Sequence, residues 1–281
     1  MKTISVVTTF HPEGMEKYGQ RFLNSFANMV DKNISMAVYA ENCMPHTNDP
    51  NQIKIINAKE VTKLNTFKER WGKVPKANGI PPDDIKARRP RDWHKAFKWD
   101  AVRFANKVYA VFHAAETCGT DWLVWMDADT FVHSNWTYKQ FAKLLPDDKW
   151  LTYVGRGKGS QTWPECGFYG MNLKHPMCIQ FLKEFERFYE DPNNGIFELE
   201  EWHDSFVFGH ILNQMTLIDN NVLDYSADMY IKSAKTGGGG HPLINTELGT
   251  WIDHMKGARK DKGKSLSKDI IVSRKEAYWN G

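Results

Sequence analysis

Two aspartates directly after a strongly apolar run are the first residues of this sequence that could carry out chemistry. Asp127 and Asp129 follow residues 122–126, which read WLVWM and have the composition of a buried strand. Carboxylates at positions i and i+2, where a strand leaves its sheet, can both face the crevice in which open α/β sheets bind ligands. Paired carboxylates bind a hard divalent cation and leave coordination positions for diphosphate oxygens. A solvated turn after the strand is the alternative interpretation.

A second group of residues lies in the stretch HMKGARK, near the C-terminal end of the sequence. His254 could supply a further metal ligand, because imidazole binds divalent metals. Gly257 would let the backbone approach a phosphate closely. Lys256, Arg259 and Lys260 could neutralise diphosphate charge. Taken alone, the same stretch could be a solvated basic tail.

An acidic stretch, EWHD at residues 201–204, lies at the start of a helix predicted over residues 202–215. Asp204, the last residue of this stretch, could remove a proton from a substrate hydroxyl group or only orient a substrate. The alternative is a helix cap, since aspartate caps helices whatever the function.

Two further sets of residues could contact a ligand. Trp163 could stack on a flat ring, and Gly167 could allow close backbone approach, although a buried strand that contains glycine explains the same pattern. Arg103 and Lys107 are spaced i, i+4 on a predicted helix and could reach a diphosphate. A solvent-facing pair is the alternative for these two cations.

An α/β sheet would position these groups. The β-branched run at residues 3–9 predicts a buried first strand. A helix over residues 15–29 and strands over residues 34–40 and 53–57 follow, which is the opening of a mostly parallel, doubly wound sheet. The other predicted helices cover residues 100–117, 137–145 and 176–190, and the other predicted strands cover residues 122–126, 151–154 and 166–172.

Residues 60–99 interrupt this alternation and predict an inserted basic and aromatic loop region within a single domain, 1–281. Prolines at 75, 81, 82 and 90 argue against regular elements in the insertion. Residues 67–99 contain ten Lys or Arg and only four Asp or Glu. Residues 232–281, which contain four consecutive glycines at 237–240, predict a flexible loop and tail.

The composition restricts the class of protein. A chain of 281 residues with 41% hydrophobic and 25% charged residues can build a globular core. The charge of 37 basic against 34 acidic residues gives no reason to expect nucleic acid binding. The four cysteines form no CxxC pair, and no leader or membrane-length apolar run is present. We therefore expect a cytoplasmic protein with reduced thiols and no membrane insertion.

Together these motifs resemble the family-8 glycosyltransferases, which have the GT-A fold. That family carries a DxD at a strand end and a C-terminal His-x-x-Gly-x-x-Lys, matched here by His254, Gly257 and Lys260. The opening VTTF is similar to the family's first strand, whose end holds the nucleobase and ribose. Asp261 and Lys262 stand where the family has Pro-Trp, and residues 60–99 have no counterpart. A vaguer similarity links the chain to glycosyltransferase-like proteins of bacteriophages.

The resemblance implies a metal-dependent glycosyltransferase that uses a nucleotide-sugar donor, in the first instance a UDP-sugar, with Mn²⁺ or Mg²⁺ as cofactor. It implies a metal site, a donor site, a catalytic carboxylate and an acceptor side. The metal ligands would be Asp127, Asp129 and His254, and the catalytic residue would be Asp204. The donor site would consist of Thr8, Thr9, Phe10, Arg103, Asp127, Gly257, Arg259 and Lys260. The acceptor side would consist of Trp163, Glu165, Gly167, Trp202 and His203.

Other functions and several acceptors stay open at this stage. A sugar-nucleotidyltransferase would carry a glycine-rich basic loop after the first strand, which HPEGMEKYG matches poorly, and a non-catalytic nucleic-acid-binding protein would show a more one-sided charge. The sugar acceptor could be a hydroxylated base in phage DNA. Lys86, Arg88, Arg89 and Arg91 would then contact phosphates and Trp93 would stack on an extruded base. Glycans and proteins are the competing acceptors.

Overall fold

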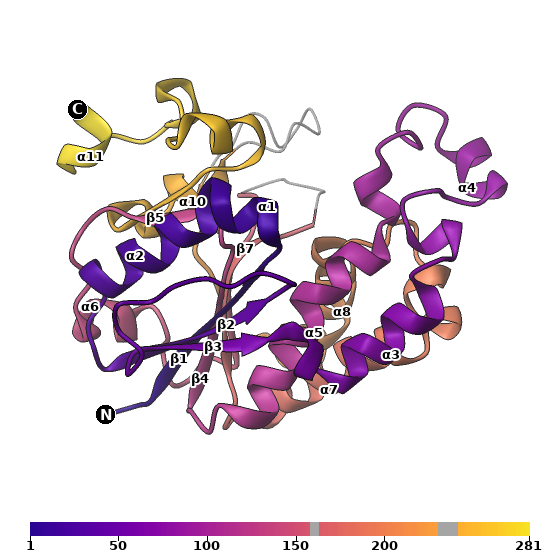
Figure 1. The fold of residues 1–281 in the computed structure, drawn as a ribbon, viewed down its shortest axis with the longest axis horizontal. Helices are drawn as coiled ribbons and strands as arrows, with labels where there is room; N and C mark the ends of the chain where they lie inside the picture. Colours follow the sequence, from indigo (N-terminus) through magenta and orange to yellow (C-terminus); the bar gives the residue numbers. More distant parts are fainter. Residues whose placement is uncertain (158–162, 230–240) are drawn as a thin grey trace.

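The computed structural model describes residues 1–157, 163–229 and 241–281. Within these residues a seven-stranded sheet and a small two-stranded sheet form the centre of the molecule (Figure 1). The strands are β1 (Ile4–Phe10), β2 (Ile34–Ala40), β3 (Ile53–Asn57), β4 (Trp122–Met126), β5 (Thr130–Val132), β6 (Leu151–Val154), β7 (Glu165–Asn172), β8 (Val222–Asp224) and β9 (Ile252–His254).

The large sheet has the strand order β3-β2-β1-β4-β7-β6-β8. Strands β1 to β4 are parallel to one another, and β8 pairs in parallel with β6. Only β7 reverses direction within this sheet, and it pairs antiparallel with both β4 and β6. The arrangement confirms the predicted fold class, an α/β domain with a mostly parallel sheet.

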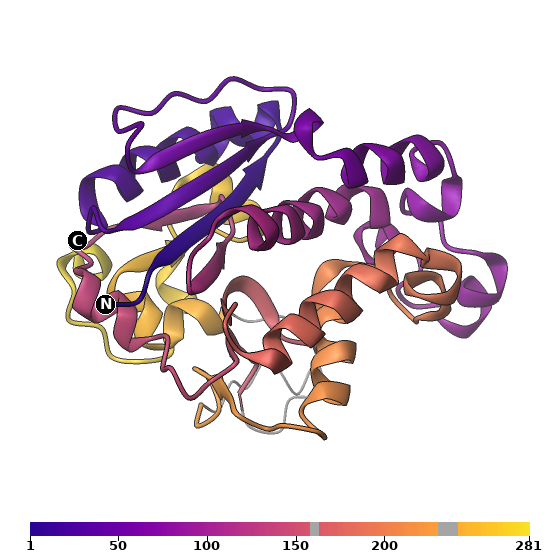
Figure 2. The same ribbon diagram turned by 90° about the horizontal axis from the view of Figure 1, so that it is seen from below.

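Helices cover both faces of the sheet, as Figures 1 and 2 show. One face carries α3, α5, α7 and α8, and the other carries α1, α2, α6 and the C-terminal elements. The helices are α1 (Pro12–Gly14), α2 (Gln20–Met29), α3 (Thr62–Trp71), α4 (Asp83–Arg88), α5 (Ala101–Thr117), α6 (Tyr138–Lys143), α7 (Pro176–Glu190), α8 (Asp204–Met215), α10 (Pro242–Asn245) and α11 (Ala277–Asn280).

The side chains of β1 explain why the sheet has two cores. Val7 packs into the cluster under α5 and α3, whereas Ile4, Val6 and Phe10 pack into the cluster under α2. Successive strand side chains point to opposite faces, so the apolar residues of β1 are buried on both faces of the sheet. The helix predicted over residues 15–29 is not α-helical throughout, because its first part, Met15–Gly19, is a π-helical turn that precedes α2.

The inserted region contains regular helices, so the expectation that residues 60–99 lack them is wrong. Helix α3 ends at Trp71, before the first proline of the region, and buries Leu64 and Phe67 against the core. Pro75 begins a 3₁₀ turn and Pro82 precedes α4, and these are positions where a proline costs no helical hydrogen bond. Figure 1 shows α4 in the lobe at the right of the molecule, away from the sheet.

Buried ion pairs attach this lobe to the segment before α8. Glu201 is fully buried, and its carboxylate lies 2.8 Å from the Lys98 Nζ and 2.5 Å from the Arg89 Nη2. Asp92 pairs with the same two cations, at 2.6 Å and 2.9 Å. Burying a charge costs free energy unless it is paired, so these contacts fix the insertion to the rest of the domain.

The C-terminal part was predicted to be flexible, and that remains a prediction. The four glycines at 237–240 lie outside the described residues. Residues 241–281 form short elements that pack beside α2 and β5. Buried Asp253 accepts hydrogen bonds from the Ser265 hydroxyl at 2.6 Å and from the Tyr278 hydroxyl at 2.7 Å, which attaches the end of the described chain to β9.

In the parts of the chain that the structure describes, none of the helices combines the length and apolar character needed to cross a bilayer.

Replacing Glu201 should destabilise the fold far more than replacing its neighbour Glu200. Glu201→Gln leaves Lys98 and Arg89 with Asp92 as their remaining carboxylate, and we expect a loss of roughly 3 kcal/mol in the free energy of unfolding. Glu200→Gln removes an exposed pair with Arg88 and should change stability little. Urea denaturation of the two variants and the wild type measures both values. Equal stability of the two variants would show that the ion pairs do not hold the lobe.

Candidate functional site

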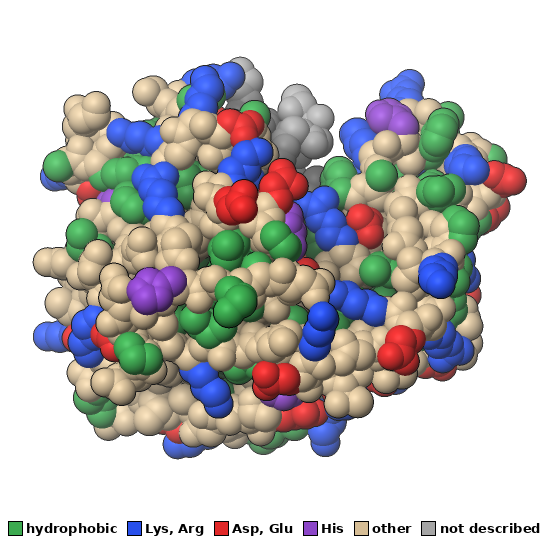
Figure 3. Space-filling view, in the orientation of Figure 1, with side chains coloured by type: hydrophobic (Ala, Val, Ile, Leu, Met, Phe, Trp, Pro, Cys, Tyr) green, Lys and Arg blue, Asp and Glu red, His purple; other side chains and the backbone are tan. Residues whose placement is uncertain are grey.

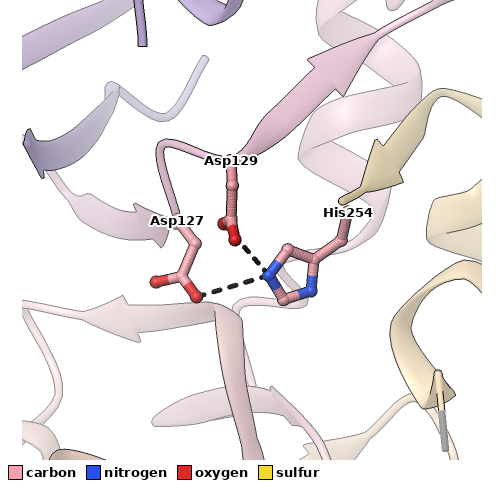
Figure 4. Close-up of side chains that lie close together, drawn as sticks. All are labelled: Asp127, Asp129 and His254. Atoms are coloured by element: carbon pink, nitrogen blue, oxygen red, sulfur yellow. Dashed lines mark ion pairs between the residues drawn. The ribbon is translucent and has the colours of Figure 1, made fainter. Parts of the chain in front are cut away.

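The two aspartates after β4 meet His254 at the end of β9. The Nε2 atom of His254 lies 3.4 Å from the Oδ2 of Asp127 and 3.2 Å from the Oδ1 of Asp129 (Figure 4). One ligand atom from each residue lies within 4.8 Å of the other two. Two carboxylate oxygens and one imidazole nitrogen fit a divalent cation such as Mn²⁺ or Mg²⁺, with further positions left for phosphate oxygens.

The two-stranded sheet brings His254 to the aspartates. Strand β5 follows Asp129 directly and pairs antiparallel with β9, in a register that sets Thr130 opposite His254. The amide of Met255 donates to the Asp129 carbonyl at 2.8 Å and extends the ladder. Gly167 provides space, since a Cβ on this residue would lie 2.6 Å from the Cε1 of His254. The close approach that Gly167 permits is therefore to the histidine ring.

The charges in this cluster stabilise one another. Burial alone would lower the pKa of His254, but the charge of Asp129 and hydrogen bonds to Asp127 and Asp129 outweigh it and raise the pKa to about 10. Burial would raise the pKa of both aspartates, but nearby positive charges outweigh it. Lys107 and His254 lower the pKa of Asp127. His254 and Lys260 lower the pKa of Asp129. An imidazolium thus lies between two carboxylates, and metal coordination would require its proton to leave.

Two lysines complete the electrostatics of the cluster. The Nζ of Lys260 lies 2.9 Å from the Oδ2 of Asp129. The Nζ of Lys107 lies 3.0 Å from the Oδ1 of Asp127 and 2.7 Å from the Oδ2 of Asp204, and it donates a hydrogen bond to the Cys166 carbonyl at 2.5 Å. One buried ammonium group therefore joins the metal-binding carboxylates to the carboxylate that begins α8.

The structure corrects two alternative interpretations of these residues. Lys107 is buried, so it is not part of a solvent-facing pair with Arg103. Burial would lower its pKa, but the charges of Asp127 and Asp204 raise it well above the usual value. Asp204 is not a helix cap either, because His203 occupies the cap position of α8 and makes no side-chain capping bond.

A cavity of about 570 Å³ opens over these groups. In the space-filling view, acidic and basic side chains gather where the surface is hollowed between the body of the molecule and the lobe with α4 (Figure 3). The cavity is lined by many of the residues predicted for the site, namely Thr9, Phe10, Arg103, Asp127, Asp129, Trp163, Glu165, His203, Asp204 and Lys260.

Other predicted site residues lie away from the cavity lining. Thr8 is fully buried in β1, and Trp202 packs its ring edge-on against Phe197. Arg259 binds Asp269, with 2.7 Å between its Nε and a carboxylate oxygen. Gly257 has a φ of +61°, which favours glycine in a turn, and open space surrounds it. The donor and acceptor roles of these four residues remain predictions.

Within the cavity, Glu165 is held by two cations. Its Oε2 lies 2.5 Å from the Lys256 Nζ and 3.2 Å from the Arg156 Nη2. Burial would raise the pKa of this carboxyl, but the two charges lower it to about 2. Lys256, which the motif suggested for diphosphate binding, therefore has a carboxylate partner inside the protein.

Sequence reasoning missed several residues that line the cavity. Lys107 was named as a possible diphosphate contact, but its burial was missed, although it stands four residues before the buried Val111 and seven before the buried Ala114, on the face of α5 that enters the core. That spacing was a usable signal. Glu41, Phe97 and Phe104 also line the cavity, and their local sequence offers no comparable signal.

The basic residues proposed for DNA binding are mostly neutralised within the protein. Lys86 pairs with Asp83 at 2.7 Å, Arg88 pairs with Asp84 and Glu200, and Arg89 pairs with Asp92 and Glu201. Trp93, the proposed stacking residue, is exposed outside the cavity lining. The structure therefore gives no support to a DNA acceptor bound by this segment.

Neither a family model nor a curated protein matches the chain. Solved structures match at low identity. Apo mouse xyloside xylosyltransferase 1 is 7% identical with a TM-score of 0.44, over 78% of this chain and 83% of that one. The apo bifunctional glycosyltransferase WbbM is 14% identical with a TM-score of 0.42, over 79% and 38%. The glycosyltransferase GlyE of Streptococcus pneumoniae TIGR4 is 10% identical with a TM-score of 0.41, over 83% and 46%.

These likenesses are too distant to establish an activity. This chain spans less than half of the WbbM and GlyE chains that it matches. The resemblances to family 8 and to bacteriophage proteins accordingly remain predictions.

Removing one ligand of the Asp-Asp-His cluster should abolish specific metal binding. A bound metal stabilises the folded state by mass action, so Mn²⁺ should raise the melting temperature of the wild type. Asp129→Asn and His254→Ala should lose that rise in a thermal denaturation titrated with MnCl₂. Asp121→Asn, at the opposite end of β4 and paired with Lys174, is the matched control and should keep it. Equal Mn²⁺ shifts in all four proteins would rule the cluster out as the metal site.

Proposed function

We propose that this chain is a metal-dependent glycosyltransferase that moves a sugar from a nucleotide-sugar donor to a hydroxyl acceptor. The observation that carries the proposal is the convergence of Asp127, Asp129 and His254 at the carboxyl edge of the sheet, beside a cavity of substrate size. A hard cation at that position, with cations of the protein around it, suits the diphosphate of a nucleotide sugar.

The donor would lie across the end of β1 and the metal cluster. Thr9 and Phe10 end β1 at the cavity wall and would border the nucleoside. Arg103 and Lys260 also line the cavity, and their positive charges would face the diphosphate. A divalent cation held by Asp127, Asp129 and His254 would stabilise the negative charge of the leaving nucleoside diphosphate. A UDP-sugar is the first donor to test.

The reaction exchanges one bond at the anomeric carbon for another. The bond from this carbon to the diphosphate oxygen breaks, and the nucleoside diphosphate leaves with the electron pair. The acceptor oxygen forms the new bond and gives up its proton, either to a protein carboxylate or to the leaving phosphate. Asp204 lines the cavity and shares Lys107 with the metal-binding Asp127, so we assign it to the acceptor hydroxyl group.

Lys107 would fix the position of the metal-binding carboxylate relative to the carboxylate that acts on the acceptor. Its ammonium group contacts Asp127 on the metal side and Asp204 on the reaction side, and its 4.6 Å approach to the Trp125 ring limits its movement. Fixed charges that need no reorganisation during the reaction are an effective form of catalysis.

A nucleotide-release assay tests the proposed function. Purified protein is incubated with UDP-, GDP- and ADP-sugars, with and without Mn²⁺, together with simple glycosides, protein and hydroxymethylated DNA as acceptors. We expect release of nucleoside diphosphate from one donor, dependent on the metal and lost in Asp129→Asn. Lack of metal-dependent release from every donor, in a protein that still binds UDP and Mn²⁺, would contradict the assignment.

Replacing Lys107 should impair turnover more than donor binding. We expect Lys107→Met to lower kcat about 100-fold, because the preorganised contact between Asp127 and Asp204 is lost. Lys63→Met is the matched control, since Lys63 also bridges two carboxylates, Glu116 and Glu186, but on the outer surface of the helices. Steady-state kinetics of both variants give the comparison, and a Lys107→Met enzyme with wild-type kcat would exclude the role.

A further inference from the structure

Four rings from four separate segments line one side of the cavity, and we call them the aromatic wall: Phe97, Phe104, Trp163 and His203. His203 is the centre of this wall. Its ring centroid lies 4.9 Å from that of Trp163, 5.7 Å from that of Phe97 and 5.8 Å from that of Phe104. Phe97 comes from the inserted region and keeps 44% of its surface exposed, so the wall presents an accessible apolar surface.

The position of His203 is determined by the buried ion network of the insertion. Its Nε2 lies 3.0 Å from the Oε2 of Glu201, whose other carboxylate oxygen binds Lys98 and Arg89. An ionised carboxylate only accepts hydrogen bonds, so the Nε2 of His203 carries a hydrogen and donates it to Glu201. The Nδ1 atom of His203 is thereby left to hydrogen-bond a ligand. Lys98 lies 5.4 Å from the centroid of the Trp163 ring and also lines the cavity.

The charge beside the wall is balanced, which bears on the kind of ligand. Residues 83–99 carry six Lys or Arg and three Asp, and Glu200 and Glu201 add two carboxylates that pair with this segment. Lys98, beside the Trp163 ring, and Lys107, which contacts Asp204, each bind two carboxylates. A polyanion such as DNA binds through several cations that neutralise its phosphates. Lysines that are already paired with carboxylates of the protein are poorly suited to that role.

From these observations we infer that the aromatic wall is the acceptor subsite and that its ligand is a neutral saccharide. One face of a sugar ring presents C–H groups that pack on aromatic rings, while its edge presents hydroxyl groups for His203 and Asp204. A mostly apolar surface with a few fixed polar groups is the usual composition of such a ligand site. The inference rests on the proposed glycosyltransferase function and specifies its acceptor. Because Phe97 belongs to the inserted region, the inference also gives that region a role in acceptor binding.

The test compares two exposed aromatics of the same segment in the full-length chain. Phe97 belongs to the wall, whereas Trp93, with 43% of its surface exposed, does not line the cavity. Phe97→Ala and Trp163→Ala should each raise the KM for a saccharide acceptor about tenfold, which corresponds to about 1.4 kcal/mol of lost contact. Trp93→Ala should leave that KM unchanged. Affinity for UDP and Mn²⁺, measured by calorimetry, reports whether the donor site of each variant is intact.

A binding measurement keeps the acceptor inference testable without turnover. Saturation-transfer NMR with methyl glycosides and disaccharides, in the presence of UDP and Mn²⁺, should show ring protons in contact with the wild type and with Trp93→Ala, and loss of contact with Phe97→Ala. Contact without transfer from any donor would refute the proposed function and leave the saccharide subsite standing. Donor turnover with transfer only to DNA or to protein, or a wild-type acceptor KM in both wall variants, would overturn the subsite.

Discussion

The need to pair buried carboxylates governs how this molecule is put together. Asp129, Glu165, Glu201 and Asp204 are all buried near the edge of the sheet, where their desolvation would be costly if they were unpaired. Their counter-charges come from distant parts of the chain: Lys107 from α5, His254 and Lys260 from the C-terminal elements, and Lys98 and Arg89 from the insertion. Each ion pair that shapes the cavity therefore also joins one segment to the domain.

This arrangement relates stability to substrate chemistry. The carboxylate of Glu201 binds only side chains of the protein, so it contributes to the fold whether or not a ligand is present. Asp127, Asp129 and His254 instead have the geometry of a divalent-cation site, and a bound cation would replace the proton of His254. Groups that act on a ligand commonly have shifted pKa values, as these three residues do. The contrast separates residues that hold the site together, such as Glu201, from those available to act on a substrate.

The sequence allowed much of the sheet to be predicted, because its signals are local. Residues of β1, β2, β4 and α5 carry apolar patterns that specify burial directly, and the predicted bounds agree with the structure within a few residues. The pairing of Asp127 and Asp129 with His254 was also predicted, but through a resemblance to a family. Nothing in the local sequence around His254 shows that β9 pairs with β5.

The predictions that failed depended on tertiary contacts or on position within an element, which composition does not show. Lys107 looked solvent-exposed and Arg88 and Arg89 looked free because a sequence shows a charge without its partner. The insertion looked irregular because its prolines were counted without regard to position, whereas Pro75 and Pro82 lie at the starts of turns and helices. Trp163 and His203 were predicted for the acceptor side, but Phe97 and Phe104 escaped notice because the four rings meet only in the folded chain.

The pairing of β5 with β9 has a consequence for the order in which the protein folds. Thr130 and His254 are far apart in the chain, so a long loop must be closed before the two strands can pair. Until β9 docks, Asp127 and Asp129 lie side by side without His254 or Lys260, and their mutual repulsion opposes compaction. The metal site is thus complete only after β9 has docked on β5, and the time at which Mn²⁺ affinity appears during refolding would report that docking step.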